Sequence, residues 1–173
     1  GGESLVPRGS TIWQITAGPL LSWQAWRVDF LPPDINGLPL HPLVVHAAVV
    51  LIPLTGVLAL LMVLVPRFSY RFGPLVLVLG WLAAGSAWLG KETGEILRQK
   101  VEDVSSAHVE AGDLLPMFAG VQAVLVTLLW LADRRGGRGV LGIMVALFTL
   151  LVVVAAGYWT YRTGETGAQN VWG

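Results

Sequence analysis

The chain has 173 residues, of which 54% are hydrophobic and 13% are charged, and its mean hydropathy is +0.67. This composition is typical of an integral membrane protein rather than of a soluble domain. The lack of cysteine excludes disulfides, iron–sulfur clusters and covalent attachment of c-type haem, and a net charge of zero gives no support to nucleic-acid binding.

The first 36 residues precede any long apolar segment. Residues 1–10 contain the thrombin-site sequence LVPRGS, so we interpret them as the remnant of an expression tag. Residues 11–36 lack the continuous apolar run and the small-residue cleavage site of a signal peptide. Their tryptophans, Trp13, Trp23 and Trp26, suit the headgroup region, and we therefore expect an interfacial N-terminal segment on the outer membrane surface.

Four apolar segments between residues 37 and 173 meet or approach the length of about 20 residues that a helix needs to cross the hydrocarbon core. We predict membrane spans at about 42–65, 74–90, 114–132 and 139–161. The short loops 66–73 and 133–139 join these spans in pairs. The sequence thus predicts an all-α integral membrane fold, a bundle of four transmembrane helices built from two hairpins.

Small residues in the second span predict how the helices pack. Gly80, Ala84 and Ala87 fall near one line along the helix, flanked by Ala83 and Gly90. Such residues let helix backbones approach closely, and in lipid van der Waals packing drives the association. Close packing is the simpler interpretation, although a line of small residues also leaves room for a flat cofactor.

Arginine in the two short loops predicts the orientation. The loops hold one acid, Asp133, and five arginines: Arg67, Arg71, Arg134, Arg135 and Arg138. Because basic residues accumulate on the cytoplasmic side, we place both loops there and both termini outside. The outer face then receives ten of the eleven acids and all three histidines. We expect a multi-pass protein of the bacterial cytoplasmic (inner) membrane, with any site facing the periplasm or cell exterior.

The histidines are the residues best suited to chemistry. His41 precedes Pro42 at the mouth of the first span, and His46 lies deeper, where an ionisable side chain in an apolar span is a functional hypothesis by default. Five residues separate the two, which at about 100° per residue places them about 140° apart around the helix. One helix therefore does not aim both rings at one point. His108, just before the third span, returns to the same membrane face, where it could pair with His46 across helices.

Three interpretations of these histidines remain open. Two neutral imidazoles from different helices suit the axial ligation of haem b, with His46 and His108 as ligands and His41 nearby. Carboxylates added to the three histidines, namely Glu92 or Glu165, suit a divalent metal ion such as zinc or copper. We expect Glu165 in a Gly-rich turn of the tail, 158–173, that folds back over the bundle mouth. Inert, structural histidines are the third interpretation.

Three motifs resemble one protein family. They are NGLPLHPLVVH ending at His46, His108 with Gly112 four residues later, and the closing GAQNVWG. Over roughly residues 36–173 the chain resembles the bacterial membrane family called domain of unknown function 2231. The resemblance implies a four-span membrane protein, sometimes found in redox or haem-related settings, without an established activity. It carries over these motif positions: His41, Pro42, His46, Pro53, His108, Gly167 and Trp172.

The chain departs from the family pattern at two places. Members often have Phe-Pro after the second histidine, where this chain has Ala47 and Ala48, and a tail histidine where this chain has Glu165. At the second position, a glutamate coordinates a hard cation or orients an imidazole in place of ligating as a histidine would.

No GxSxG, P-loop or HExxH motif is present, so the sequence indicates no particular enzyme activity. We therefore expect a histidine-lined site for haem b or a metal ion, in a redox, electron-transfer or cofactor-handling role. The alternative is a non-catalytic structural or accessory subunit of a larger membrane complex. In either case the bilayer is one partner, and a membrane-complex partner or a second copy of the chain is another.

Overall fold

The structure is a computed structural model that describes residues 34–35, 38–98 and 106–172. All described residues belong to one unit, Pro32–Gly173. The predicted tag remnant (1–10) and most of the predicted interfacial segment (11–36) therefore lie outside the described residues.

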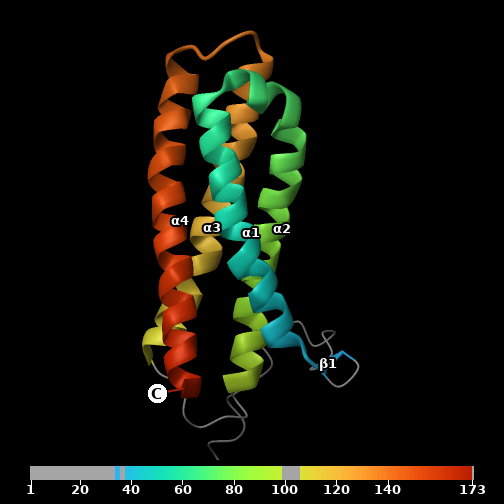
Figure 1. Cartoon of the computed structure of the whole chain (residues 1–173), viewed down its shortest axis with the longest axis vertical. Coiled ribbons are helices and arrows are strands. Elements are labelled where there is room, and N and C mark those ends of the chain that lie inside the picture. Colours follow the sequence, from blue (N-terminus) through green and yellow to red (C-terminus); the bar gives the residue numbers. More distant parts are fainter. Residues whose placement is uncertain (1–33, 36–37, 99–105, 173) are drawn as a thin grey trace, which may run out of the picture. The chain divides into compact units, whose positions relative to one another are not determined.

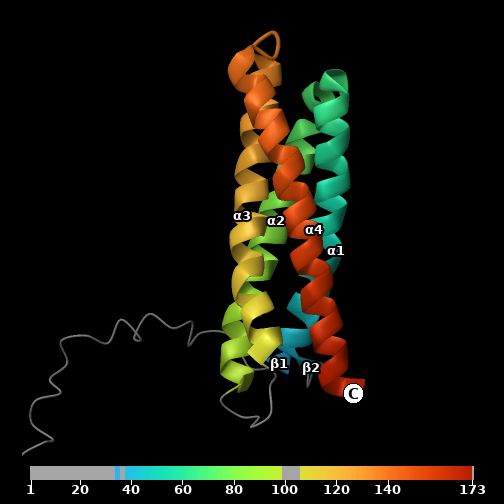
Figure 2. The ribbon, with the colours of Figure 1, turned by 90° about the vertical axis from the view of Figure 1, so that its left-hand side faces the viewer.

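Four helices, α1 (Leu40–Leu64), α2 (Pro66–Arg98), α3 (Ser106–Arg134) and α4 (Val140–Trp172), make up nearly all of the described chain. Each is long and apolar enough to cross a membrane. Successive helices run in opposite directions (Figures 1 and 2), and α1 and α3 each pack against both α2 and α4. A short antiparallel pair, β1 (Asp34–Ile35) with β2 (Leu38–Pro39), precedes α1. The predicted all-α bundle of four transmembrane helices in two hairpins is confirmed.

The two ends of the bundle differ in composition, and we name each end after the residues that it holds. The arginine end holds the α1–α2 turn and the α3–α4 loop, with Arg67, Arg71, Arg134, Arg135 and Arg138. The histidine end is the opposite one, where α1 and α3 begin and α2 and α4 end (Figure 1).

The predicted loop at 66–73 is wrong, because those residues are the first two turns of α2. Only Val65 separates the two helices, and its carbonyl accepts hydrogen bonds from the backbone N–H groups of Phe68 and Ser69 at 2.9 and 3.2 Å. Proline biases the preceding residue away from the helical region but suits the first helical turn itself, so Pro66 both ends α1 and begins α2. Pro74, predicted as the start of the second span, lies inside the helix.

The predicted Gly-rich turn in the tail is also wrong, because α4 continues to Trp172. Glu165 is therefore a helical residue and does not fold back over the bundle mouth. Three buried threonines in this part, Thr160, Thr163 and Thr166, donate hydrogen bonds of 2.7–2.8 Å to the carbonyl four residues earlier. These bonds satisfy the threonine hydroxyl groups within the helix itself, so the threonines can be buried against neighbouring helices. This packing keeps the segment helical in spite of the weak helix propensity of Gly164 and Gly167.

The α3–α4 loop depends on glycine and on one arginine. Gly136 and Gly137 have φ of 94° and 142°, a backbone region open mainly to glycine. Arg138 then donates to Asp133, with Nε 2.7 Å from Oδ1, and to the carbonyls of Met62 and Val63 in the last turn of α1. Those carbonyls have no partner within α1. Arg138, which belongs to the α3–α4 hairpin, thus caps the end of α1 in the other hairpin.

The core divides into two clusters along the bundle. The cluster nearer the histidine end is rich in alanine, whereas the one nearer the arginine end contains larger side chains, including Met62, Val126 and Leu129. Ala83 and Ala87 belong to the first cluster, and Gly80 closely approaches Thr55 of α1 and Ala123 of α3. The small residues of the second span thus pack helices together, as predicted.

The helices are longer than the membrane is thick. At 33 residues each, α2 and α4 measure about 50 Å, against a hydrocarbon core of about 30 Å. Counting about 20 residues from the arginine end reaches exposed aromatic side chains, Trp88 on α2 and Tyr158 and Tyr161 on α4. The histidine end therefore extends beyond this aromatic level.

Candidate functional site

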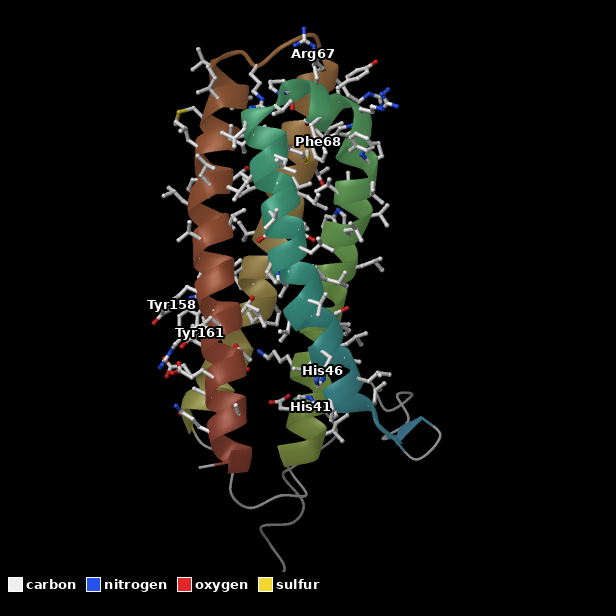
Figure 3. The ribbon with its side chains drawn as sticks, in the orientation of Figure 1. His41, His46, Arg67, Phe68, Tyr158 and Tyr161 are labelled. Carbon is white, nitrogen blue, oxygen red and sulfur yellow. The ribbon has the colours of Figure 1, made fainter. Side chains whose placement is uncertain are left out.

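The helix arrangement gathers the predicted site residues at the histidine end. His41 and His46 lie in the first two turns of α1, His108 lies in the first turn of α3, and Glu92 and Glu165 lie in the later turns of α2 and α4. Figure 3 shows His41 and His46 farther along the bundle than Tyr158 and Tyr161, away from Arg67. These positions share one end of the bundle, at or beyond the aromatic level.

His41 joins α1 to α2. Its Nδ1 lies 3.1 Å from the carbonyl oxygen of Gly90 and 3.1 Å from the hydroxyl of Thr93. That hydroxyl already donates to the carbonyl of Leu89 at 2.8 Å, so it accepts from the ring. Both partners are acceptors, and Nδ1 of His41 therefore carries the proton.

Gly94 provides the space for the His41 ring. A Cβ atom on Gly94 would lie 3.0 Å from Cε1 of His41, whereas one on Gly90 would meet Val45 at 3.5 Å, an ordinary contact. We expect Gly90→Ala to stabilise the protein by up to about 1 kcal/mol through helix propensity, and Gly94→Ala to lose most of that gain by displacing the ring. Thermal unfolding of the matched pair in detergent measures the difference, and equal midpoints for the two variants would contradict the contact.

His46 faces away from the core. Its side chain is exposed, and its Nδ1 lies 2.6 Å from the carbonyl oxygen of Pro42, one turn earlier in α1. Since a carbonyl only accepts, Nδ1 donates, and Nε2 of the neutral ring carries the lone pair. Within the described residues, no hydrogen-bond partner is found for that nitrogen. The structure turns His41 to α2 and His46 outward, in agreement with the offset of about 140° expected between them.

The remaining predicted ligands are not joined to these two rings. The backbone of His108 belongs to α3, but its side chain, like that of Trp172, lies outside the described residues. Glu165 forms an ion pair with Arg162 of its own helix at 3.3 Å, and Glu92 is half-buried on α2. Among the side chains that the structure describes, no three His, Cys, Asp or Glu residues form a group able to hold a metal ion.

Sequence reasoning missed several polar residues at this end. Thr93 is the hydroxyl partner of His41, and Lys91 forms an ion pair with Asp113 of α3 at 3.2 Å. Thr160 and Thr163 contribute buried hydroxyl groups from α4. The spacing of three between Thr160, Thr163 and Thr166 was the available signal, because it places threonines on adjoining positions of one helix face.

The chemistry open to this end follows from its imidazoles. Metal-ligating histidines usually donate their other ring N–H to a carbonyl or carboxylate, which fixes the tautomer and the ring orientation. His46 has this arrangement, since Pro42 holds Nδ1–H and Nε2 is exposed. A neutral imidazole of this kind suits iron, copper or zinc.

Comparison with known proteins agrees with the architecture. Residues 37–173 match the family described as "Predicted membrane protein (DUF2231)". Because the match covers most of the chain, the protein belongs to this family. No curated protein and no solved structure matches the chain.

Proposed function

We propose that this member of the DUF2231 family binds haem b at its histidine end and serves an electron-transfer or cofactor-handling role in the bacterial inner membrane. His46 is the proposed axial ligand, and His41 is a supporting residue that fastens α1 to α2. The ring of His46 faces away from the core and His108 lies on α3, diagonal to α1, so we do not assign His108 to the same iron. Bound haem would supply one-electron oxidation and reduction at this end.

The observation that carries the proposal is the hydrogen bond between His46 and Pro42. It holds the ring by Nδ1 at 2.6 Å and leaves an exposed side chain whose other nitrogen has the lone pair needed for ligation.

Haem fits the described residues better than a metal ion held by the protein alone. Haem iron needs only one or two axial side chains, and its porphyrin needs apolar surroundings. The neighbours of His46 on the same face of α1, Leu43 and Val50, are 56% and 62% exposed. A zinc or copper ion needs three or four protein ligands, and the described side chains hold no group of three. A zinc or copper site would also draw on Glu165, which is paired with Arg162.

The test compares haem content among variants of the full chain, expressed with haem supply and purified without chelator. We expect a Soret band in the unaltered protein and its loss in His46→Ala, because the ring is the proposed ligand. Val57→Ala, an exposed position farther along the same face of α1, is the matched control and should retain the band. A His46→Ala variant with an unchanged Soret band per chain would overturn the assignment.

Glu165→Gln separates haem from a divalent metal ion. Under the haem proposal this variant keeps its Soret band, whereas loss of protein-bound zinc or copper on this substitution would favour the metal site. If the chain carries neither cofactor and retains co-purifying membrane proteins after all three histidines become alanine, the accessory-subunit alternative is favoured.

A further inference from the structure

The arginine end presents cations that the histidine-end proposal leaves unused. Arg67 and Arg71 lie in the first two turns of α2, and Arg134 and Arg135 lie where α3 meets the loop; all four are exposed. Figure 3 shows Arg67 at this end of the bundle with its side chain directed away from the helices. The end is therefore a cationic surface on two separate connections of the chain.

No exposed acid neutralises this surface. In the described residues from 66 to 91 and from 114 to 164, the one acidic residue is Asp133. Its side chain is 2% exposed and is bonded to Arg138, whose side chain is 13% exposed. The Asp133–Arg138 pair is internal, and the charges of the four exposed arginines remain uncompensated.

The helix ends leave this charge balance to the side chains. Both α2 and α4 begin at the arginine end, and neither has an acidic residue in its first turn. A helix N-terminus carries a partial positive charge of about half an elementary charge. Because α1 and α3 end at the same place, their partial negative charges offset this contribution, and the arginine side chains are what attract anions there.

Exposed apolar side chains beside the arginines indicate where these cations lie relative to the acyl chains of the membrane. Phe72 and Leu75 on α2 and Leu141 on α4 are 42%, 56% and 79% exposed, as expected of side chains in contact with acyl chains. The guanidinium groups also lie over aromatic rings, with Arg71 5.6 Å from the centroid of Phe72 and Arg134 5.0 Å from that of Trp130. Such contacts hold arginine beside the apolar boundary, where lipid phosphates lie.

We propose that the arginine end is a binding surface for the phosphate headgroups of anionic phospholipids in its own leaflet. Arg67 with Arg71 forms one contact pair and Arg134 with Arg135 the other. Arg138 is not part of the surface, because its guanidinium is occupied by Asp133 and by the end of α1. Charge complementarity favours anionic over zwitterionic lipids, and the adjoining apolar surface favours a lipid over a soluble phosphate.

The test uses the full chain in a neutral detergent, titrated with phosphatidylglycerol, phosphatidylcholine or soluble glycerol phosphate while the thermal unfolding midpoint is followed. We expect phosphatidylglycerol to raise the midpoint and the other two additives to have little effect. An equal rise with phosphatidylcholine would overturn the proposal, and a rise with glycerol phosphate at matched concentration would identify a soluble-anion site instead.

Variants locate the effect. Arg67→Gln/Arg71→Gln and Arg134→Gln/Arg135→Gln should each weaken the apparent affinity for phosphatidylglycerol, by about fivefold per arginine removed. Arg162→Gln removes a half-buried arginine at the histidine end and should leave the affinity unchanged. Because both arginine pairs are exposed, we expect both double variants to fold. If one of them does not, the other double variant is sufficient for the test. Unchanged lipid preference in a folded pair variant, or an equal loss in Arg162→Gln, would contradict the proposal.

Discussion

Replacing Arg138 with alanine is expected to lower the free energy of unfolding by about 3–5 kcal/mol, the range for breaking a buried ion pair on one side. The substitution leaves the carboxylate of Asp133, 2% exposed, without its cation. It also leaves the carbonyls of Met62 and Val63 at the end of α1 without a donor. The two hairpins then lose the bond that joins them at this end.

Matched substitutions isolate the contribution of the pair. Arg135 is an exposed arginine of the same loop, and Arg135→Ala should change stability by no more than about 0.5 kcal/mol. Asp133→Asn should cost less than Arg138→Ala, because Arg138 keeps its two carbonyl acceptors. Unfolding by sodium dodecyl sulfate in mixed micelles, followed by tryptophan fluorescence, measures all three. If Arg138→Ala and Arg135→Ala unfold at the same detergent fraction, the bond between hairpins contributes nothing.

The second large effect is expected at Gly73, where α2 meets the ring of Trp130. A Cβ atom there would lie 2.0 Å from Cδ1 and 2.7 Å from Cγ of Trp130. A small adjustment does not relieve such an overlap, because Trp130 is packed against the cluster around Met62 and Leu129. We expect Gly73→Ala to cost about 1–3 kcal/mol or more, in spite of a gain in helix propensity of up to about 1 kcal/mol.

Gly85 provides the control on the same helix. It has no heavy atom within 4 Å of the position of an added Cβ, so Gly85→Ala should be neutral or stabilising. A smaller side chain in place of the Trp130 ring should restore space. The loss of stability in Gly73→Ala combined with Trp130→Leu should therefore be smaller than the sum of the losses in the single variants. Strict additivity in the detergent unfolding measurement would show that the indole does not limit residue 73.

The fold was predictable because lipid restricts the choices. A span needs about 20 apolar residues, and four such segments joined by two short connections leave little besides an antiparallel bundle. Helix ends were predicted poorly for a physical reason. Hydropathy reports where a helix is in lipid, whereas α2 and α4 continue past the membrane as helices with Lys91, Arg162 and other charged residues.

The candidate site was predictable only in part. Hairpin connectivity placed the start of α1, the start of α3 and the end of α4 at one end of the bundle, as the helices show. The direction of each ring depends on atoms far away in the sequence. His41 bonds to Thr93, 52 residues later, and Gln122 donates at 3.2 Å to the carbonyl of Ile52, 70 residues earlier. Periodicity within one helix gives the angle between His41 and His46 but not the neighbour that each ring meets.

The two ends of the bundle carry different polar groups. At the arginine end, charge is either paired internally, as in Arg138, or exposed, as in Arg67. At the histidine end, imidazoles meet backbone carbonyls, and ion pairs such as Lys91 with Asp113 lie beyond the aromatic level. A cofactor bound by His46 would lie at the boundary of lipid and water, where partners on either side of that boundary reach it.

Haem binding at the histidine end is tested on one sample of the unaltered chain, purified without chelator after expression with haem supply. Its absorption spectrum and its iron, zinc and copper contents are determined together. We expect a Soret band with iron in proportion to haem, and zinc and copper well below one per chain. A folded protein with neither a Soret band nor iron would contradict haem binding.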